Sequence, residues 1–512
     1  MKKTYIYLLA FVLSFSAVSC EDWMNIDPAG KQNTTNYWQN AGEVEAVLGT
    51  AYLNMRKAIT NKTFVYWGEM RGNGLGIIES SAYNVRNGDI LPGNSLCKWE
   101  DMYNVIGMAN SVIKYAPTVV EKDDSFNDGE MRSTLAEAYF LRAFCYFTLV
   151  RTFRDVPYVT EPYVNDDADF WLPKTDGNEI LRSEIAAITP YIEYAKEFFP
   201  EETDTKGRAT RWAIYTLLAD MNLWLSASDA GNAQTYLQDC IDACDAVINS
   251  GRVGLIAGSE WFTNFYPGNS NESIFELQFS NALSQTNSFM NWFGGTQDVI
   301  STANGRYFYT SAVSYMRLAS LSPSDVRGAG GSYPSTATTY NYTTVWKYYG
   351  IDTQGTARGD LDNDQNWIIY RLAEVYLMKA EAVALQGDYG TAIDILNDVR
   401  TRGGSEGLQK TLYGNEYDVI KAILDERAIE FFAEGKNWYD LLRTGLRYER
   451  NPNYQDLLLD ECTNGLTSIS AALVRSKMKR NIPYSWYLPI STSELEANPN
   501  LVQNPAYANL GN

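Results

Sequence analysis

The sequence predicts a mainly α-helical protein in which helices pair as hairpins and one loop-rich segment interrupts the helical body. Three observations support this fold class. Apolar residues recur every three or four positions through most of the chain, which is the period of an amphipathic helix. Residues 209–249 and 367–402 each hold two such stretches joined by a short turn that contains glycine. Residues 258–350 lack this period and are rich in Gly, Ser, Asn and Thr.

The composition narrows the class of function. The chain has 512 residues, 45% hydrophobic and 20% charged, as in folded globular proteins, and its length indicates more than one core region. A net charge of −20 disfavours nucleic acid as a partner, because an acidic surface repels phosphate. The chain has no histidine, which excludes Ser-His and Cys-His nucleophile pairs. Composition leaves open a pair of catalytic carboxylates, as in glycoside hydrolases, because the chain has 62 acidic residues.

The cysteines and clustered acids give no metal or cofactor site. None of the six cysteines forms a CxxC motif, and we expect no disulfide framework. Cys240 and Cys244 share one face of a predicted helix, and we interpret them as small buried residues rather than metal ligands. Asp360, Asp362 and Asp364 alternate as in a calcium loop, but the glycine and the glutamate of such a loop are missing. We interpret these acids as the cap of a helix that begins near residue 367.

Residues 1–19 have the pattern of a secretory signal peptide. Lys2 and Lys3 precede a mostly apolar stretch, and the small residues Ala17 and Ser19 lead directly to Cys20. Small residues immediately before a cysteine resemble a lipobox, so we predict that Cys20 is acylated and begins the mature chain. An ordinary signal peptide followed by a chance cysteine is the alternative. No later stretch approaches about 18 consecutive apolar residues, so the lipid is the predicted anchor.

The region 20–257 is predicted to be helical, apart from an irregular segment at 71–94 that is rich in Gly, Asn and Ser. Pro157 ends the strongest of the helices, because a proline disfavours helix in the residue before it. Pro190 is expected to bend another. The predicted helices cover residues 43–59, 96–115, 132–154, 178–199, 209–226 and 233–249.

Residues 258–350 are predicted to form a loop-rich sub-domain inserted in the helical body, with one short strand at 273–280. Phe, Trp and Tyr make up 19 of the 89 residues from Trp261 to Tyr349, against 13% of the whole chain, and charged residues are few. Such an aromatic excess requires either a local core or a ligand, and the sequence leaves both open.

Residues 351–512 return to helices, predicted at 367–386, 389–402 and 419–444. Gly387 and Asp388 supply a turn between the first two, and the pair resembles a tetratricopeptide-type hairpin. Hairpins of this kind stack and bury each other's apolar faces. The tail at 484–507 is rich in Pro and Asn and cannot form one long helix.

Five segments, taken in order, resemble the SusD/RagB family of outer-membrane nutrient-binding lipoproteins. The first, AEAYFLRAFCYFTLVRTFRDVP, is similar to an Ala-rich helix of the family that ends in Phe-x-Asp-Val-Pro. Two others, RLAEVYL and ERAIEFFAEGKNWYDL, resemble the family's R-x-A-E-V-x-L and E-R-x2-E-F-x2-E-G-x2-W-x-D-L patterns. Ser491 and Ala506 depart from the family pattern, where proline and glycine are common. The five segments lie at 136–157, 207–210, 371–377, 424–441 and 488–505.

The resemblance implies a scaffold of tetratricopeptide-like hairpins and a lipoprotein at the cell outer membrane, facing the exterior. It also implies a partner, a SusC-like TonB-dependent transporter, over which the protein would sit as a hinged lid. Ligands in this family are usually oligosaccharides and in some branches peptides. The resemblance and the composition together divide the chain into four parts: a signal peptide (1–19), an N-terminal helical region (20–257), the loop-rich sub-domain (258–350) and a C-terminal helical region (351–512).

We expect the ligand to contact a shallow face formed by loops, because loops on a rigid support carry function. Sugar rings stack their C–H faces on aromatic rings, and their hydroxyls require hydrogen-bond partners. Each aromatic in such a region can instead fill a local core, and this alternative stays open for every one of them. The candidate ligand-binding residues are Tyr83, Trp292, Asn304, Arg306, Tyr307, Tyr309 and Tyr340.

The sequence is compatible with four functions. The leading one is a non-catalytic lipoprotein that binds an oligosaccharide and delivers it to an outer-membrane transporter. The second is the binding of a peptide or another nutrient on the same scaffold. The third is a surface glycoside hydrolase, against which stand the lack of a catalytic motif and the resemblance to a non-catalytic family. The fourth is a purely structural surface protein. We expect no turnover of any bound ligand.

Overall fold

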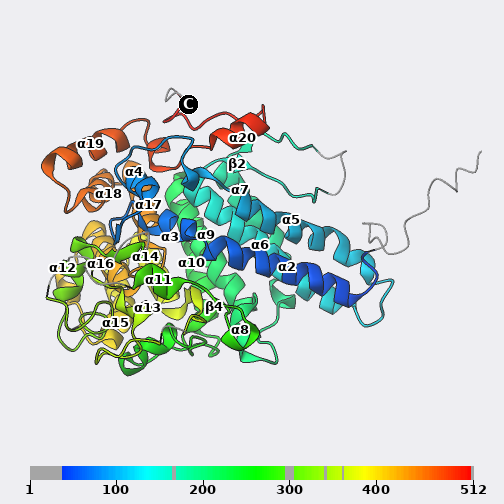
Figure 1. The fold of residues 1–512 in the computed structure, drawn as a ribbon, viewed down its shortest axis with the longest axis horizontal. Helices are drawn as coiled ribbons and strands as arrows, with labels where there is room; N and C mark the ends of the chain where they lie inside the picture. The colour runs from blue at the N-terminus through cyan, green and yellow to red at the C-terminus, as the bar shows by residue number, and fades with distance from the viewer. Residues whose placement is uncertain (1–36, 164–168, 295–304, 339–342, 360–361, 509–512) are drawn as a thin grey trace, which may run out of the picture.

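The N-terminal region of the computed structural model is built on long helices that lie side by side (Figure 1). The structure describes residues 37–163, 169–294, 305–338, 343–359 and 362–508. Asn127 begins the longest helix by accepting hydrogen bonds from the backbone N–H groups of Gly129 and Glu130, and Arg154 ends it at a φ of 70°. The helices of this region are α2 (Ala41–Thr60), α3 (Lys62–Glu69), α4 (Ser80–Arg86), α5 (Glu100–Tyr115), α6 (Asp128–Phe153), α7 (Gly177–Ile188) and α8 (Glu202–Gly207).

Two helix hairpins form the centre of the scaffold. The first pairs α9 (Arg211–Ser228) with α10 (Ala233–Ile248), and the second pairs α14 (Leu372–Leu385) with α15 (Tyr389–Gly403). Helix α10 packs on α14, so the two hairpins stack although more than 100 residues separate them in sequence. Stacked hairpins bury one another's apolar faces, as in tetratricopeptide arrays. The predicted mainly α fold with tetratricopeptide-like hairpins is confirmed.

Three predicted helices differ from the structure. Residues 367–371 form strand β6 (Trp367–Arg371), which pairs antiparallel with β4 (Ser273–Leu277), so α14 begins five residues later than expected. Asp362 and Asp364 therefore do not cap a helix: Asp362 accepts a hydrogen bond from the backbone N–H of Gly359, and Asp364 accepts one from the backbone N–H of Asn281. Asp360 lies outside the described residues. The expected helix at 419–444 is two helices, α16 (Glu416–Glu430) and α17 (Asn437–Gly445), separated where Ala433 and Gly435 take positive φ. The expected helix at 178–199 ends as a 3-10 turn at Thr189–Tyr194, beside Pro190.

The loop-rich segment 258–350, called the insert below, carries short elements around an aromatic core. The predicted strand is present as β4. The ring of Phe293 stacks on Tyr348 with centroids 4.6 Å apart, and Tyr348 stacks on Trp367 of β6 at 5.4 Å. Much of the aromatic excess therefore fills a local core. The other described elements of the insert are α11 (Phe289–Phe293), β5 (Phe308–Thr310), α12 (Ala312–Ala319) and α13 (Trp346–Tyr349).

Buried ion pairs attach the insert to the C-terminal helices. The Arg327 guanidinium lies 2.5 Å from Glu426 and 2.9 Å from Glu430, both on α16, and all three side chains are essentially inaccessible. Lys347 pairs with Glu434 at 2.8 Å. Burial alone would raise the pKa of Glu430, yet three arginines hold it well below its usual range. We call this set the buried charge network; its members are Glu272, Asp325, Arg327, Lys347, Arg371, Arg402, Glu426, Glu430 and Glu434.

The C-terminal segment returns across the top of the molecule in the view of Figure 1. It contains α18 (Asn453–Thr463), α19 (Ser468–Met478) and α20 (Thr492–Ala497). In the N-terminal region, a small sheet pairs β2 (Val156–Pro157) with β3 (Lys174–Thr175). Among the described residues, no helix is both long and apolar enough to cross a bilayer. Cys240 and Cys244 are buried and free, as the sequence predicted. Cys20 and the signal peptide lie outside the described residues.

Candidate ligand-binding face

A two-stranded sheet joins the N-terminal region to the insert and brings several predicted site residues together. Strand β1 (Leu75–Ile77) pairs antiparallel with β5, and Gly76 faces Tyr309 across the ladder. The Tyr309 ring lies directly over Gly76, because a Cβ on that residue would stand 2.1 Å from a ring carbon. Only glycine permits this approach, so the sequence at position 76 allows Tyr309 to lie flat on the sheet.

Tyr83 projects from α4, which follows β1 closely. Tyr83 is 49% exposed, and Asn84 beside it is also exposed. Glu79 precedes α4 and accepts hydrogen bonds from the Ser81 hydroxyl at 3.1 Å and from the Tyr66 hydroxyl at 2.9 Å. The start of α4 is therefore held in place while Tyr83 stays open to solvent.

Tyr307 lies just before β5 and is half-buried. The Lys62 ammonium sits 3.5 Å from the centroid of its ring, a cation–π geometry, and the same ammonium lies 3.4 Å from Glu79. The backbone of Tyr307 is fixed from both sides: its N–H donates to Trp292 and its carbonyl accepts from Ile78. The ring is thus positioned before any ligand arrives.

Two arginines accompany these rings. Burial lowers the pKa of the Arg86 guanidinium, and the hydroxyls of Tyr309 and Tyr83 lie close enough to oppose that shift. Arg86 also donates to the side chain of Asn73. Arg306 donates to the backbone carbonyl of Met290 at 3.3 Å, and its Nε is buried without a hydrogen-bond partner. We call Tyr83, Asn84, Arg86, Tyr307 and Tyr309 the aromatic face.

Not every predicted residue belongs to this face. Trp292 is only 8% exposed and packs edge-on against Phe289 at 5.2 Å, so the structure corrects the expectation of an open ring at this position. The physical reason is that α11 turns its aromatic side chains toward the core of the insert. Asn304 and Tyr340 lie outside the described residues.

Sequence reasoning missed Lys62 and Arg86 as members of the site. Lys62 begins α3 and Arg86 ends α4, 245 and 221 residues before Tyr307 in the sequence, and no local pattern distinguishes them from other surface cations. Only the pairing of β1 with β5 places them beside the rings.

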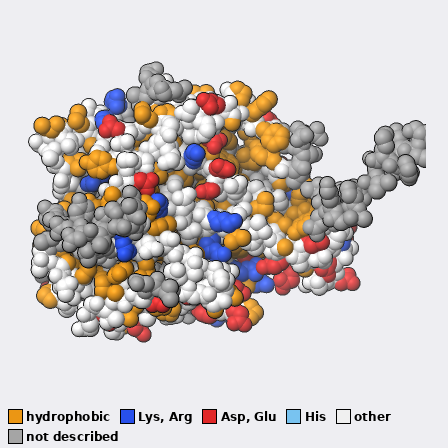
Figure 2. Space-filling view, in the orientation of Figure 1, with side chains coloured by type: hydrophobic (Ala, Val, Ile, Leu, Met, Phe, Trp, Pro, Cys, Tyr) orange, Lys and Arg blue, Asp and Glu red, His pale blue; other side chains and the backbone are white. Residues whose placement is uncertain are grey.

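The arrangement offers flat apolar surface together with hydrogen-bond donors and acceptors, which suits a hydroxylated ligand. The side chains that Figure 2 colours as acidic and basic are interspersed over the face shown there, rather than separated into one basic patch. Among the described residues, no three His, Cys, Asp or Glu side chains converge as they would around a metal ion.

Comparison with known proteins places the chain in a family. A model described as "SusD family" matches residues 302–507, and one described as "Starch-binding associating with outer membrane" matches residues 22–223. A SusD-like protein of Formosa agariphila is 25% identical, over 99% of this chain and 99% of its own length.

Solved structures have the same fold. A SusD homologue from Bacteroides thetaiotaomicron superposes with a TM-score of 0.72 at 24% identity, covering 92% of this chain and 99% of that one. Surface glycan-binding protein A from Bacteroides uniformis superposes with a TM-score of 0.68 at 22% identity, covering 91% and 99%. The two family models together account for most of the sequence, and the chain therefore belongs to the SusD/RagB family of proteins associated with the outer membrane.

Proposed function

We propose that this protein is a surface lipoprotein, anchored through Cys20, that binds an oligosaccharide on the aromatic face and delivers it to a SusC-like TonB-dependent outer-membrane transporter. The ligand is bound without chemical change. The observation that carries the proposal is the exposure of Tyr83 beside the fixed rings of Tyr307 and Tyr309. An exposed aromatic side chain on a rigid support is available for stacking, whereas a packed ring such as Trp292 is not.

An oligosaccharide suits the aromatic face better than a peptide does. Peptides are commonly bound along an open strand edge or in an apolar groove. The rings are accompanied by Asn84 and Arg86 rather than by an apolar trench. Sugar hydroxyls can accept hydrogen bonds from these side chains while the ring faces stack. Peptide binding on the same scaffold is the second candidate.

Outer-membrane residence and delivery to a transporter rest on the family and on the N-terminal sequence. One family model is described as starch-binding and associated with the outer membrane, and one structural relative is named as a surface glycan-binding protein. Lipid attachment at Cys20 would hold the protein at the membrane surface, where a ligand can pass directly into a transporter. Replacement of Cys20 by alanine should release the protein from membrane fractions.

The carboxylate nearest the aromatic face is in a structural setting rather than a catalytic one. Glu79 accepts from Tyr66 and Ser81 and pairs with Lys62, so its lone pairs are engaged by residues that hold α4. A glycoside hydrolase needs two carboxyl groups on either side of the scissile bond. We therefore assign Glu79 to the support of the site.

The test is calorimetric titration of the purified protein with a panel of oligosaccharides and a panel of peptides. Stacking contributes about 0.5–1.5 kcal/mol per ring beyond the buried area, so replacing both Tyr83 and Tyr307 by alanine should weaken oligosaccharide binding roughly tenfold or more. The matched control is Trp171→Ala, which removes another exposed ring, 56% accessible, from a different surface. Unchanged affinity in the double variant, or equal loss in the control, would contradict the proposal.

A further inference from the structure

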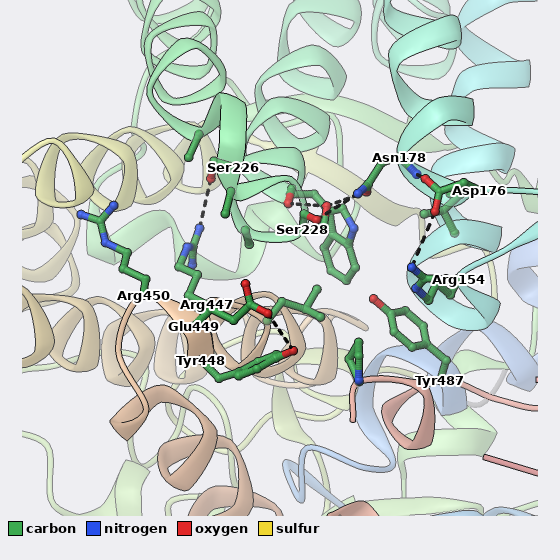
Figure 3. A pocket seen from close by; sticks show the side chains of 18 residues that line it. Arg154, Asp176, Asn178, Ser226, Ser228, Arg447, Tyr448, Glu449, Arg450 and Tyr487 are labelled. Atoms are coloured by element: carbon green, nitrogen blue, oxygen red, sulfur yellow. Dashed lines mark hydrogen bonds and ion pairs between the residues drawn. The ribbon is translucent and has the colours of Figure 1, made fainter. Parts of the chain in front are cut away.

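A separate cavity opens where the C-terminal ends of α6 and α9 meet the start of α7 and the turn after α17 (Figure 3). Its volume is about 490 Å³, within the usual range of small-molecule sites. It shares no residue with the aromatic face. Its floor is buried and includes Val150, Trp224, Leu446 and Tyr487, while its rim is open to solvent.

The floor carries a hydroxyl group without a partner. Tyr487 is 3% exposed, and Figure 3 shows its hydroxyl directed into the cavity. This hydroxyl makes no hydrogen bond to any residue that the structure describes. The indole N–H of Trp224, whose side chain is 1% exposed, likewise has no partner within the described residues. Both atoms reach the surface of the cavity rather than being sealed in the interior, so they can pair with water or with the hydroxyl groups of a ligand.

Arg447 supplies further hydrogen-bonding capacity at the floor. One terminal nitrogen of Arg447 donates to the Glu381 carboxylate at 2.8 Å. This ion pair balances the positive charge of the guanidinium. The other terminal nitrogen makes only long contacts, 3.5 Å to the carbonyl of Leu223 and 3.4 Å to the hydroxyl of Ser226. Contacts of this length are weak, so this nitrogen can donate to a ligand in the cavity.

The rim is balanced in charge. Arg154 and Arg450 lie on it together with Asp176 and Glu449, as Figure 3 shows. Arg154 lies 3.6 Å from Asp176, and Arg450 pairs with Glu416 outside the cavity. With the cations matched by anions, the cavity offers no surplus charge to an ionic ligand. Donors and acceptors around an apolar floor suit an uncharged ligand that carries many hydroxyls.

We propose that this cavity is a second binding site, which takes a small uncharged polyhydroxylated molecule of monosaccharide or disaccharide size. The ligand hydroxyls pair with Tyr487, with the indole N–H of Trp224 and with the terminal nitrogen of Arg447 that makes only long hydrogen bonds. Its C–H groups contact Val150 and Leu446. The site is independent of the aromatic face and does not require the function proposed for it.

The experiment is saturation-transfer NMR with the purified protein and six sugars: glucose, galactose, mannose, xylose, maltose and cellobiose. At least one should bind. Tyr487→Phe removes only the unpaired hydroxyl and should raise the dissociation constant about two- to tenfold, the effect of one neutral hydrogen bond. Ala230→Trp places a bulky ring at the exposed rim and should abolish binding. Because the hydroxyl has no partner in the protein, the melting temperature of Tyr487→Phe should not fall.

Two controls separate this site from others. Tyr484→Phe changes the same group three residues away, outside the cavity lining, and should leave binding unchanged. Tyr83→Ala alters the aromatic face and should also leave it unchanged, so failure of the second site and failure of the proposed function are distinguishable. The proposal is overturned if none of the six sugars binds, if both cavity variants bind as the wild type does, or if the cavity takes glucuronate in preference to glucose.

Discussion

The stacked hairpins and the insert reach the same degree of burial by different interactions. In α14 the buried side chains are almost all aliphatic, from Leu372 through Leu377 to Leu385. In the insert, Arg327 and Lys347 are as inaccessible as those leucines, and they are matched by acids from α16 and the turn after it. The two hairpins pack on each other mainly by apolar contact, and the buried Glu374 and Glu381 of α14 pair with arginines of α16, α17 and the turn after α17. The insert is attached to the helices by its aromatic core and, to a greater extent than the hairpins, by the buried charge network.

The contrast explains how a loop-rich segment can present a fixed binding face. Irregular chain presents few regular apolar faces, so directional ion pairs are added to the contacts of the aromatic core. An ion pair in the interior offsets its desolvation only when the geometry is good and every charge has a partner. Here Arg371 meets Glu272 at 2.7 Å and Glu434 at 2.9 Å, which joins β6, the insert and the end of α16 at one residue.

The largest expected effect follows from breaking this network. Arg327→Met leaves Asp325, Glu426 and Glu430 with fewer partners in the interior, and should lower the free energy of unfolding by about 3–5 kcal/mol. The control Arg132→Met removes an exposed pair with Asp128 and should change stability far less, because solvent screens such a pair. Urea denaturation measures both. Equal effects of the two substitutions would show that the network does not hold the insert.

A core truncation in the hairpins tests the other half of the comparison. Leu377 is fully buried in α14, and Leu377→Ala should cost about 2–5 kcal/mol through lost contact and a cavity. Leu412→Ala, at a residue that is 70% exposed, should change stability by less than about 0.5 kcal/mol. Hydrogen exchange on the Leu377 variant should accelerate first in α14 and α15. Faster exchange confined to the insert would contradict the division between the two regions.

An effect that depends on pH is expected at Glu69, where α3 meets the break between α16 and α17. Its carboxylate accepts from the backbone N–H of Gly435 at 2.8 Å, but its second oxygen is buried without a partner, and burial raises its pKa to about 8. Between its ordinary pKa near 4.5 and about 8, the folded state binds the proton more tightly than the unfolded state does. Stability should therefore fall as pH rises, by at most about 1.4 kcal/mol per pH unit.

Glu69→Gln removes this dependence. The variant should match the wild type near pH 5 and be more stable near pH 8, as followed by thermal unfolding over that range. Glu43→Gln, the same substitution at a half-buried position in the first turn of α2, serves as the control. A variant that is destabilised equally at all pH values would indicate that the charged form of Glu69 is the one present in the folded protein.

The sequence predicted the regular half of the molecule well and the irregular half incompletely, for physical reasons. Periodic apolar residues specify α9, α10, α14 and α15 through local spacing alone. The strand at Trp367–Arg371 has the same apolar character as a buried helix, and only its pairing with β4 distinguishes the two. The partners of Arg327 lie about 100 residues away in sequence, so no local pattern shows that this arginine is buried.

The residues of the candidate site also divide into those that local sequence could identify and those that depend on tertiary packing. Tyr83 could be chosen from sequence because it stands in a Gly- and Asn-rich segment, and it is exposed. Trp292 stands in an equally polar segment, yet it is buried, because the packing of α11 on the rest of the insert is a tertiary property. The position of Tyr307 beside Lys62 depends on the pairing of β1 with β5, which the sequence analysis did not foresee.

The most direct test of the central claim is hydrogen exchange of the purified protein with and without the oligosaccharide that binds most tightly in titration. The aromatic face combines two segments that are distant in sequence, so a ligand bound there should slow exchange in residues 75–86 and 305–310 together. The stacked hairpins α9–α10 and α14–α15 should be unchanged. Protection that appears in the hairpins, or in neither segment of the face, would contradict the account.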